Sequence, residues 1–389
     1  MHMQNHEMYG AVVIGGGYFG CAAAYYLTKA GVKTMLIERG EIAGCASGAN
    51  FGNVQVQDSN MGLSFQLTLE GFHLMQNMTE ELGCDIGYET CPSIITAETE
   101  KHIPMLRQLY EEKKNAGLDI RWLEGDDVTK AEPNLAKGTV LAATQFVQGK
   151  VYPFSYLYAL IRRARENGLT VAENSEVGSL YLESGECRGV VLKDGTVIRA
   201  EHVIAAAGSG TGRLCASAGL DVPVLSVKAE CIVTEALAPF LKNYYSSAAF
   251  FAEAHDPERA STSLCISQSH YGNLLIAETT KPYKIVRPEY YDLCSMEHCE
   301  NIRELIIKYF PALENIQVLR SWCVPSPATA DYNPILGKSP VPGLIIDAGF
   351  KSAVVMSAIS GIIVTDLVTK DSCPYELNSF TACIGRNRE

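Results

Sequence analysis

Three glycines near the start of the chain have a spacing that suits the binding of a dinucleotide. Gly15, Gly17 and Gly20 form the pattern G-x-G-x-x-G directly after the apolar residues 11–14. In such a pattern the first glycine permits a tight turn, the second lets the backbone approach a pyrophosphate, and the third lets a helix pack closely on a strand. The pattern therefore predicts a strand, a phosphate-binding turn and a helix whose N-terminus faces the phosphates.

An acidic side chain follows at the distance that this chemistry requires. Glu38 ends the next apolar run, and it follows Gly15 by about 20 residues, which is the spacing of an acid that binds ribose. We expect its carboxylate to accept hydrogen bonds from the hydroxyl groups of the adenosine ribose. A glycine turn in an unrelated α/β protein would leave the position of Glu38 a coincidence, so we favour the dinucleotide site.

The glycine pattern alone does not separate NAD from FAD, because both cofactors contain the same ADP group. Two further segments favour FAD. Residues 44–53 form a loop of small residues that suits a long cofactor, and residues 203–212 form a second apolar run that ends in small residues. An NAD-dependent dehydrogenase would explain Gly15 and Glu38 but would leave both segments without a role.

The elements that position these motifs are predicted from hydrophobic periodicity. Short apolar runs are typical of buried parallel strands, and apolar residues at spacings of three and four indicate helices. Strands are expected at 11–14, 34–37, 203–207 and 344–347, and helices at 20–30, 61–82, 154–167 and 352–367. Asp194 and Gly195 stand between two apolar runs, which predicts a hairpin. The segments 226–234 and 263–277 alternate with polar residues, which indicates a mostly antiparallel sheet.

At these motifs the sequence resembles the FAD-dependent amino-acid and amine oxidoreductases, a family that includes D-amino acid oxidase, glycine oxidase and sarcosine oxidase. The resemblance extends from Val12 to about Leu367. Ser47 to Asn50 match the loop that contacts the flavin in this family, and they are most similar to the flavoprotein beta subunits of opine, proline and hydroxyproline dehydrogenases. A further match runs from Arg320 to Asp331 and resembles the family segment Arg-x-Trp…Thr-Pro-Asp.

The resemblance implies a fold of the class α/β plus antiparallel β, with a discontinuous Rossmann-like FAD-binding domain and an inserted, mostly antiparallel substrate domain. The FAD-binding domain would comprise residues 8–83, 149–222 and 321–372. The substrate domain would comprise residues 84–148 and 223–320. These boundaries agree with the way in which the strand and helix pattern is interrupted twice.

The resemblance and the motifs together imply a set of residues that bind FAD. They are Gly15, Gly17, Tyr18, Phe19, Gly20, Glu38, Arg39, Ser47, Gly48, Ala49, Asn50, Gly52, Asn53, Val177, Ala207, Gly208, Gly349, Phe350, Lys351 and Ser352. Val177 corresponds to a backbone contact with adenine. The helix that begins near Lys351 would direct its N-terminus at the edge of the flavin that gains negative charge on reduction.

The catalytic candidates are Lys351, Gln268 and Tyr271. Family members that bind a free amino-acid carboxylate commonly have an arginine five residues before the aspartate of the Thr-Pro-Asp segment, because a guanidinium binds a carboxylate bidentately. This chain has Ser326 at that position, which leaves Lys351, Lys228 or a cation from a partner protein for the task. The strand at 273–276 also lacks the lysine that assists reaction with oxygen in sarcosine-type oxidases.

Composition excludes several classes of function. The chain has 389 residues, 47% of them hydrophobic, and a net charge of −12, which is the wrong sign for nucleic-acid binding. The thirteen cysteines are an odd number and scattered, which favours a reducing cytoplasm over a disulfide framework. No run is apolar enough to span a membrane. We expect no metal site, because Cys294 and Cys299 do not have a common zinc spacing.

Two hypotheses about function remain open. The first is an enzyme that oxidises an amino acid or an N-substituted amino acid through FAD, with hydride transfer to the flavin and an imine as product. The absent oxygen-assisting lysine favours a dehydrogenase that passes electrons to an iron–sulfur or flavin subunit. The second is a flavin-holding subunit that transfers electrons or acts as a scaffold within a multisubunit complex and has little activity alone.

Overall fold

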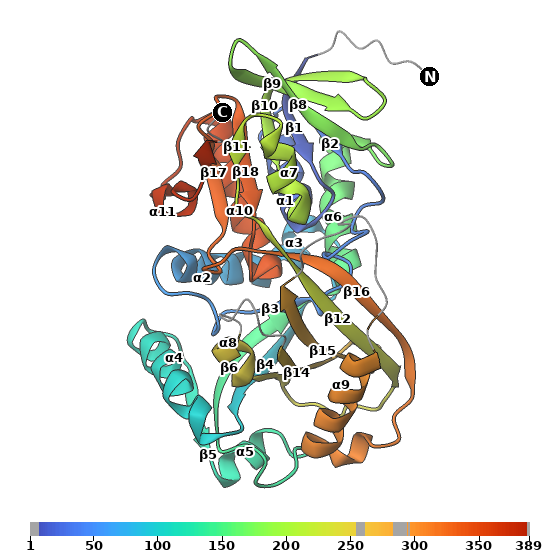
Figure 1. Ribbon diagram of the computed structural model, residues 1–389, viewed down its shortest axis with the longest axis vertical. Helices are drawn as coiled ribbons and strands as arrows, with labels where there is room; N and C mark the ends of the chain where they lie inside the picture. Colours follow the sequence, from blue (N-terminus) through green and yellow to red (C-terminus); the bar gives the residue numbers. More distant parts are fainter. Residues whose placement is uncertain (1–7, 254–260, 283–293, 295, 387–389) are drawn as a thin grey trace.

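The chain is built around two β-sheets that lie at opposite ends of the molecule (Figure 1). The computed structural model describes residues 8–253, 261–282, 294 and 296–386. Both ends of the described chain belong to the half that contains the first sheet, whereas the middle of the sequence supplies most of the second (Figure 1).

The first sheet contains the predicted parallel strands. Its strand order is β17-β18-β10-β1-β2-β7, in which β18, β10, β1, β2 and β7 are parallel and β17 is antiparallel at the edge. The strands are β1 (Tyr9–Ile14), β2 (Thr34–Ile37), β7 (Thr170–Ala172), β10 (Val197–Ala205), β17 (Ile335–Lys338) and β18 (Leu344–Ala348). Nearly all residues of β1, β2 and β18 are buried, as expected for a sheet that is covered on both faces.

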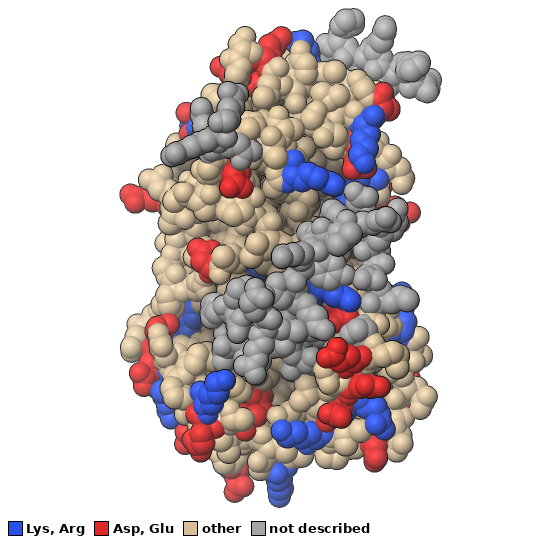
Figure 2. All heavy atoms as spheres, in the orientation of Figure 1, with Lys and Arg blue, Asp and Glu red and all other residues tan. Residues whose placement is uncertain are grey.

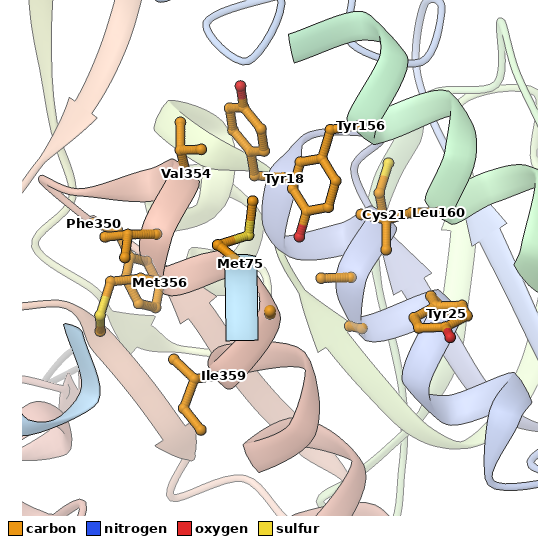
Figure 3. Close-up of a cluster of buried hydrophobic side chains, with 14 of the residues drawn as sticks. Tyr18, Cys21, Tyr25, Met75, Tyr156, Leu160, Phe350, Val354, Met356 and Ile359 are labelled. Carbon is orange, nitrogen blue, oxygen red and sulfur yellow. The ribbon is translucent and has the colours of Figure 1, made fainter. Parts of the chain in front are cut away.

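Four helices form a layer on one face of this sheet. They are α1 (Tyr18–Lys29), α2 (Leu63–Gln76), α6 (Pro153–Glu166) and α10 (Ala353–Thr369). In this layer α1 and α10 pack on the strands, α2 packs on α10 and α6 packs on α1. Figure 3 shows Tyr18 of α1 between Tyr156 of α6 and Val354 of α10, with Met75 of α2 below them in this view. The hydroxyl of Tyr156 also hydrogen-bonds to Ser357 of α10 (3.0 Å). This packing holds the N-termini of α1 and α10 on the same side of the sheet.

The predicted hairpin is confirmed. Strands β9 (Glu186–Leu192) and β10 are antiparallel around Asp194 and Gly195, and Gly195 has a φ of +88°, which favours glycine. Strand β8 (Val177–Glu183) pairs with β9 on its other side. These strands extend beyond the first sheet at the top of Figure 1. Ser175, two residues before β8, donates a backbone hydrogen bond to the carbonyl oxygen of Glu38 at the end of β2. This brings Val177, the predicted contact of adenine, close to Glu38.

The second sheet is mostly antiparallel, as predicted. Its order is β16-β12-β15-β14-β13-β4-β6-β3, β5 pairs with β6, and the β13–β4 pair alone is parallel among the described pairs. The strands are β3 (Asn53–Val54), β4 (Glu89–Ala97), β5 (Arg121–Glu124), β6 (Ala142–Lys150), β12 (Leu225–Ala236), β13 (Tyr244–Ser247), β14 (Ser261–Gln268), β15 (Asn273–Pro282) and β16 (Val318–Ala328). The helices α4 (Ile103–Asn115), α5 (Asp126–Ala131), α8 (Ala248–Glu253) and α9 (Met296–Tyr309) lie around it (Figure 1).

Two expectations about individual elements, a single strand over 263–277 and a single helix over 61–82, need correction. The segment 263–277 is two strands, β14 and β15, because the chain turns at Gly272 (φ +88°). The helix expected over 61–82 is divided at Asn77 into α2 and α3 (Met78–Leu82). Strand β16 pairs with β12 of the second sheet and extends across the predicted boundary at 321. The domain boundaries themselves stay a prediction.

The remaining elements are short. They are α7 (Thr211–Ala216), α11 (Asn378–Thr381), β11 (Leu220–Asp221), β19 (Gly385–Arg386) and the 3₁₀ turns Glu100–His102, Gly208–Gly210 and Pro311–Leu313. Among the described residues, no helix has the length and apolar character that crossing a membrane requires.

Candidate functional site

A cavity of about 550 Å³ lies between the two sheets. One wall consists of the chain that follows β1, β2 and β10, and the opposite wall consists of residues from β12 and β16. Since β2 and β10 flank β1 on opposite sides, the cavity lies at the point where the strand order reverses. In open α/β sheets this is the place where nucleotide ligands bind.

The predicted phosphate turn has the geometry that its glycines require. Gly15 has a φ of +110°, and a Cβ at this residue would lie 2.4 Å from the carbonyl oxygen of Ala206. A Cβ on Gly20 would lie 1.8 Å from the carbonyl oxygen of Gly15. A Cβ on Gly17 would meet Ser47 Oγ at 2.8 Å, beside the cavity. Helix α1 begins directly after Gly17, so its backbone N–H groups face the cavity as a site for phosphate.

Glu38 lines the cavity and also shapes the turn. Its carboxylate accepts hydrogen bonds from the backbone N–H groups of Gly16 (2.6 Å) and Gly40 (2.9 Å). Sequence reasoning did not anticipate these two bonds. Because each carboxylate oxygen has more than one acceptor position, a ribose hydroxyl can still bind there. The predicted bond to ribose stays a prediction.

Replacing Glu38 with alanine is expected to weaken FAD binding about 10- to 100-fold. Loss of a charge-assisted hydrogen bond costs ~1.5–3 kcal/mol, and the N–H groups of Gly16 and Gly40 would also lose their acceptor. Titration of the apoprotein with FAD measures the change. Glu38→Gln, which keeps one acceptor, should lose less, and Glu41→Ala at an exposed neighbour should bind normally. Wild-type affinity in Glu38→Ala would contradict this role.

The loop at 44–53 is held by its own side chains. Ser47 Oγ accepts a hydrogen bond from the N–H of Tyr18 (3.1 Å), and Asn50 Nδ2 donates to the carbonyl oxygen of Ser47 (2.6 Å). Trp322 Nε1 of β16 donates to the carbonyl oxygen of Ala49 (3.2 Å). Burial raises the pKa of the Tyr18 phenol, so the hydroxyl stays neutral as it contacts Asn50. The loop is therefore preorganised before any ligand binds.

All but four of the predicted cofactor residues line the cavity. The four exceptions are glycines that lie behind its wall: Gly20, Gly48, Gly52 and Gly349. A Cβ on Gly48 would lie 2.2 Å from the carbonyl oxygen of Ala43, and one on Gly52 would lie 2.0 Å from that of Val151. These glycines let the wall pack closely on the structure behind it.

The N-terminus of α10 forms the next part of the wall. Phe350 stacks on Phe19 with ring centroids 3.8 Å apart, and Ser352 is the residue before the helix. Lys351 lines the cavity, and its ammonium donates to the carbonyl oxygen of Asp58 (2.8 Å) and pairs with Asp58 Oδ2 (3.4 Å). The helix N-terminus and Lys351 together place positive potential at this end of the cavity.

The opposite wall contains polar side chains that sequence reasoning missed. Glu230 of β12 is 1% exposed and pairs with Lys228 (Nζ to Oε1, 3.2 Å). Tyr244 of β13 and Cys265 of β14 also line the cavity, and the tyrosine hydroxyl contacts the cysteine sulfur. Ser326, at the position where the resemblance led us to expect an arginine, lines the cavity, whereas Lys228 does not. Only the strand order brings these residues together, so no sequence motif could have identified them.

Two catalytic candidates lie away from the cavity. The amide oxygen of Gln268 accepts hydrogen bonds from the N–H groups of Phe240 and Leu241, and its amide nitrogen donates to the carbonyl oxygen of Ala238. Tyr271 is 68% exposed in the turn after β14 and contacts the ring of Tyr152. These contacts favour a structural role for Gln268 and a surface position for Tyr271. Neither position supports a catalytic role, so the roles of Gln268 and Tyr271 in catalysis stay predictions.

The charges on the surface are mixed. Among the residues coloured in Figure 2, lysine and arginine are interspersed with aspartate and glutamate, most densely over the half that contains the second sheet. Among the described residues, no three or more His, Cys, Asp or Glu side chains are grouped in a way that could hold a metal ion.

Comparisons with known proteins agree with this geometry. The family model for FAD dependent oxidoreductases, DAO, matches residues 11–367. The glycine oxidase of Bacillus licheniformis is 28% identical, and the match covers 93% of each chain. The sarcosine oxidase subunit beta of Rhodobacter capsulatus is 25% identical over 95% of this chain and 86% of its own.

The solved structures show the same architecture. The crystal structure of glycine oxidase from Geobacillus kaustophilus has a TM-score of 0.85 with 27% identity, and the match covers 96% of this chain and 98% of that one. The turn, the acidic residue and the glycine-lined wall fit the ADP part and the flavin of one cofactor. The chain belongs to the DAO family of FAD-dependent oxidoreductases.

Proposed function

We propose that the protein oxidises the C–N bond of an amino acid or an N-substituted amino acid, and that it acts as a dehydrogenase that passes electrons to a partner protein. The observation that supports this most directly is the cavity between the phosphate turn and the second sheet. The similarity to glycine oxidase and to sarcosine oxidase subunit beta supports an amine or amino acid as substrate.

The chain's own residues would orient such a substrate. Bound FAD would supply the hydride acceptor. Glu230 and Lys228 pair at the second-sheet wall. On the opposite wall the N-terminus of α10 favours a substrate carboxylate, and Lys351, whose charge is shared with Asp58, adds to this effect. The hydroxyls of Ser326 and Tyr244 can hydrogen-bond to it. Residues of β12 and β16 cover this end of the cavity and exclude water, which strengthens these electrostatic interactions.

The choice of dehydrogenase over oxidase follows from the residues of β15. Leu274 and Ile276 are fully buried in the core of the second sheet. A fixed positive charge near the reacting edge of a flavin stabilises the negative charge that forms on oxygen. Among the described residues of β15, Ala277 lines the cavity and brings no charge, and the charge of Lys351 on the opposite wall is shared with Asp58. Relatives named as subunits support a partner protein as acceptor, which would be an iron–sulfur or flavin subunit. Location in the cytoplasm likewise stays a prediction.

The test is anaerobic mixing of the FAD-loaded protein with a panel of amino acids, N-methyl amino acids, imino acids and opines. At least one of these compounds should bleach the flavin absorbance at a rate of about 1 per second or faster, which is typical of enzyme turnover. Stopped-flow mixing of the reduced protein with either air-saturated buffer or an acceptor dye then compares the acceptors. We expect the dye to reoxidise the flavin at least tenfold faster than oxygen does.

Each outcome has a defined meaning. If no compound of the panel bleaches the flavin, amine oxidation loses its support and the alternative of a subunit with little activity alone gains it. If oxygen reoxidises the flavin as fast as the substrate reduces it, the protein is an oxidase instead. Purified protein that binds NAD and no flavin would refute the cofactor assignment as well.

A further inference from the structure

The chain between β3 and α2 contacts both the cavity and helix α4. This segment, residues 55–60, begins with Gln55, which lines the cavity. Gln57 is buried and donates from Nε2 to Ser93 Oγ (2.6 Å), and it accepts a hydrogen bond from Thr144 (3.0 Å). The segment therefore has a defined position between the cavity wall and the second sheet.

Lys113 of α4 is bound to this segment in an unusual way for a lysine. The residue is 1% exposed, whereas lysine is almost never fully buried unless it is paired. Its ammonium donates to the carbonyl oxygen of Ser59 and to Ser59 Oγ (3.2 Å), and it lies 4.0 Å from the ring centroid of Phe65. Burial lowers the pKa of Lys113 from 10.5 to about 8, so the group is still charged at pH 7.

Asp58, the residue before Ser59, connects the Lys113 ammonium to the cavity. Asp58 is 9% exposed, and its Oδ2 and carbonyl oxygen both bind the ammonium of Lys351. Its other oxygen, Oδ1, is buried and has no hydrogen-bond partner among the described residues. Because a buried carboxylate is costly unless it is compensated, the charges of Lys113 and Lys351 are what make its burial tolerable.

We propose that Lys113 is a positioning residue for Lys351. By anchoring Ser59, it holds Asp58 in place, and Asp58 in turn holds the Lys351 ammonium at the cavity wall. Helix α4 belongs to the inserted segment and does not line the cavity, so Lys113 acts through the 55–60 segment without contact with substrate or cofactor. The inference rests on the proposed binding of FAD beside Lys351.

The first test measures the midpoint potential of the bound flavin. A positive charge near the flavin stabilises its reduced, more negative form. We expect Lys351→Met to lower the ratio of reduced to oxidised flavin about tenfold at a given potential, which equals about 30 mV for a two-electron couple. Lys113→Met should lower it by a similar factor, because Lys351 loses its fixed position.

The double variant separates positioning from a general loss of structure. If Lys113 acts through Lys351, Lys113→Met should change the ratio less than twofold in the Lys351→Met background. Lys114→Met provides the matched control, since its ammonium is exposed and bonds to Tyr110 on the same helix. The proposal would be overturned if Lys113→Met changed the ratio of reduced to oxidised flavin equally in the wild-type and Lys351→Met backgrounds, or changed it in neither.

A second test needs no cofactor. In the apoprotein, the amide hydrogens of Val56 and Ser59 are bonded to Gln148 Oε1 and to the carbonyl oxygen of Val56. Lys113→Met should increase their exchange rates at least tenfold, and Lys114→Met should not. Unchanged exchange in Lys113→Met would refute the anchor. If the wild-type protein bound no FAD, the proposed function would fail while this experiment still decided whether Lys113 holds the segment.

Discussion

Replacing Gly20 with alanine is expected to abolish retention of FAD. The added methyl carbon would lie 1.8 Å from the carbonyl oxygen of Gly15, a distance that no packed structure tolerates. Since both partners are backbone, α1 and the turn after β1 must separate, and the N–H groups at the start of α1 then no longer face the phosphates. We expect the affinity for FAD to fall at least 100-fold, which equals about 2.7 kcal/mol.

The measurement is the ratio of flavin to protein absorbance after gel filtration, followed by titration of the apoprotein with FAD. Gly40→Ala provides a control in the same region, because the nearest atom to its Cβ would be Glu38 Oε1 at 3.8 Å. This variant should bind FAD with wild-type affinity. Circular dichroism would show whether Gly20→Ala keeps its secondary structure. Stoichiometric FAD in Gly20→Ala would refute the proposed geometry of the turn.

A second large effect is expected in the dependence of stability on pH. Asp347 of β18 is 1% exposed, and burial raises the pKa of its carboxyl group from 3.8 to about 7. Ser360 of α10 donates a hydrogen bond to Oδ1 (2.6 Å), but Oδ2 has no hydrogen-bond partner among the described residues. The neutral form of Asp347 therefore suits its site better than the charged form.

The sign of the effect follows from proton linkage. Between pH 4 and pH 7 the folded state binds a proton at Asp347 that the unfolded state has released, so the free energy of unfolding falls as pH rises. Between pH 5 and pH 8 this group should account for a loss of about 2–3 kcal/mol. Below pH 4 its contribution is constant.

Comparison with Asp347→Asn isolates this contribution. The asparagine keeps an oxygen for Ser360 but does not titrate, so urea unfolding at pH 5 and pH 8 should show a smaller fall in the variant. Asp119→Asn changes an exposed carboxylate and should leave the wild-type fall intact. If wild-type protein and Asp347→Asn differ by the same amount at both pH values, Asp347 does not titrate in this range.

Local spacing in the sequence was sufficient to identify the nucleotide half of the site. Gly15, Gly17 and Gly20 are close together in the chain, and each performs a backbone task that only glycine allows, so their pattern predicts the turn directly. The position of Glu38 follows from the length of one strand–helix–strand unit. The hairpin at Gly195 and the strands of the first sheet were predicted for the same reason, because their signals lie within a few residues.

Other local features were decided by contacts that the sequence does not display. The break at Asn77 divides a segment whose apolar periodicity continues across it, so periodicity alone predicted one helix. Strand β16 lies in the chain between α9 of the inserted segment and β17 of the first sheet. Its pairing with β12 over residues 318–328 determines to which sheet it belongs.

The substrate half of the site depends on tertiary structure almost entirely. Glu230, Tyr244, Cys265 and Ser326 come from four different strands, and they share a wall because of the order in which those strands pair. Lys113 illustrates the same point: its sequence pattern is that of a solvated lysine, yet the fold buries it against Ser59. The sequence by itself determined the cofactor and the turn that binds it, because those signals are local. The tertiary structure alone decided which side chains line the second-sheet wall of the cavity, because strand order and burial arise from contacts between distant residues.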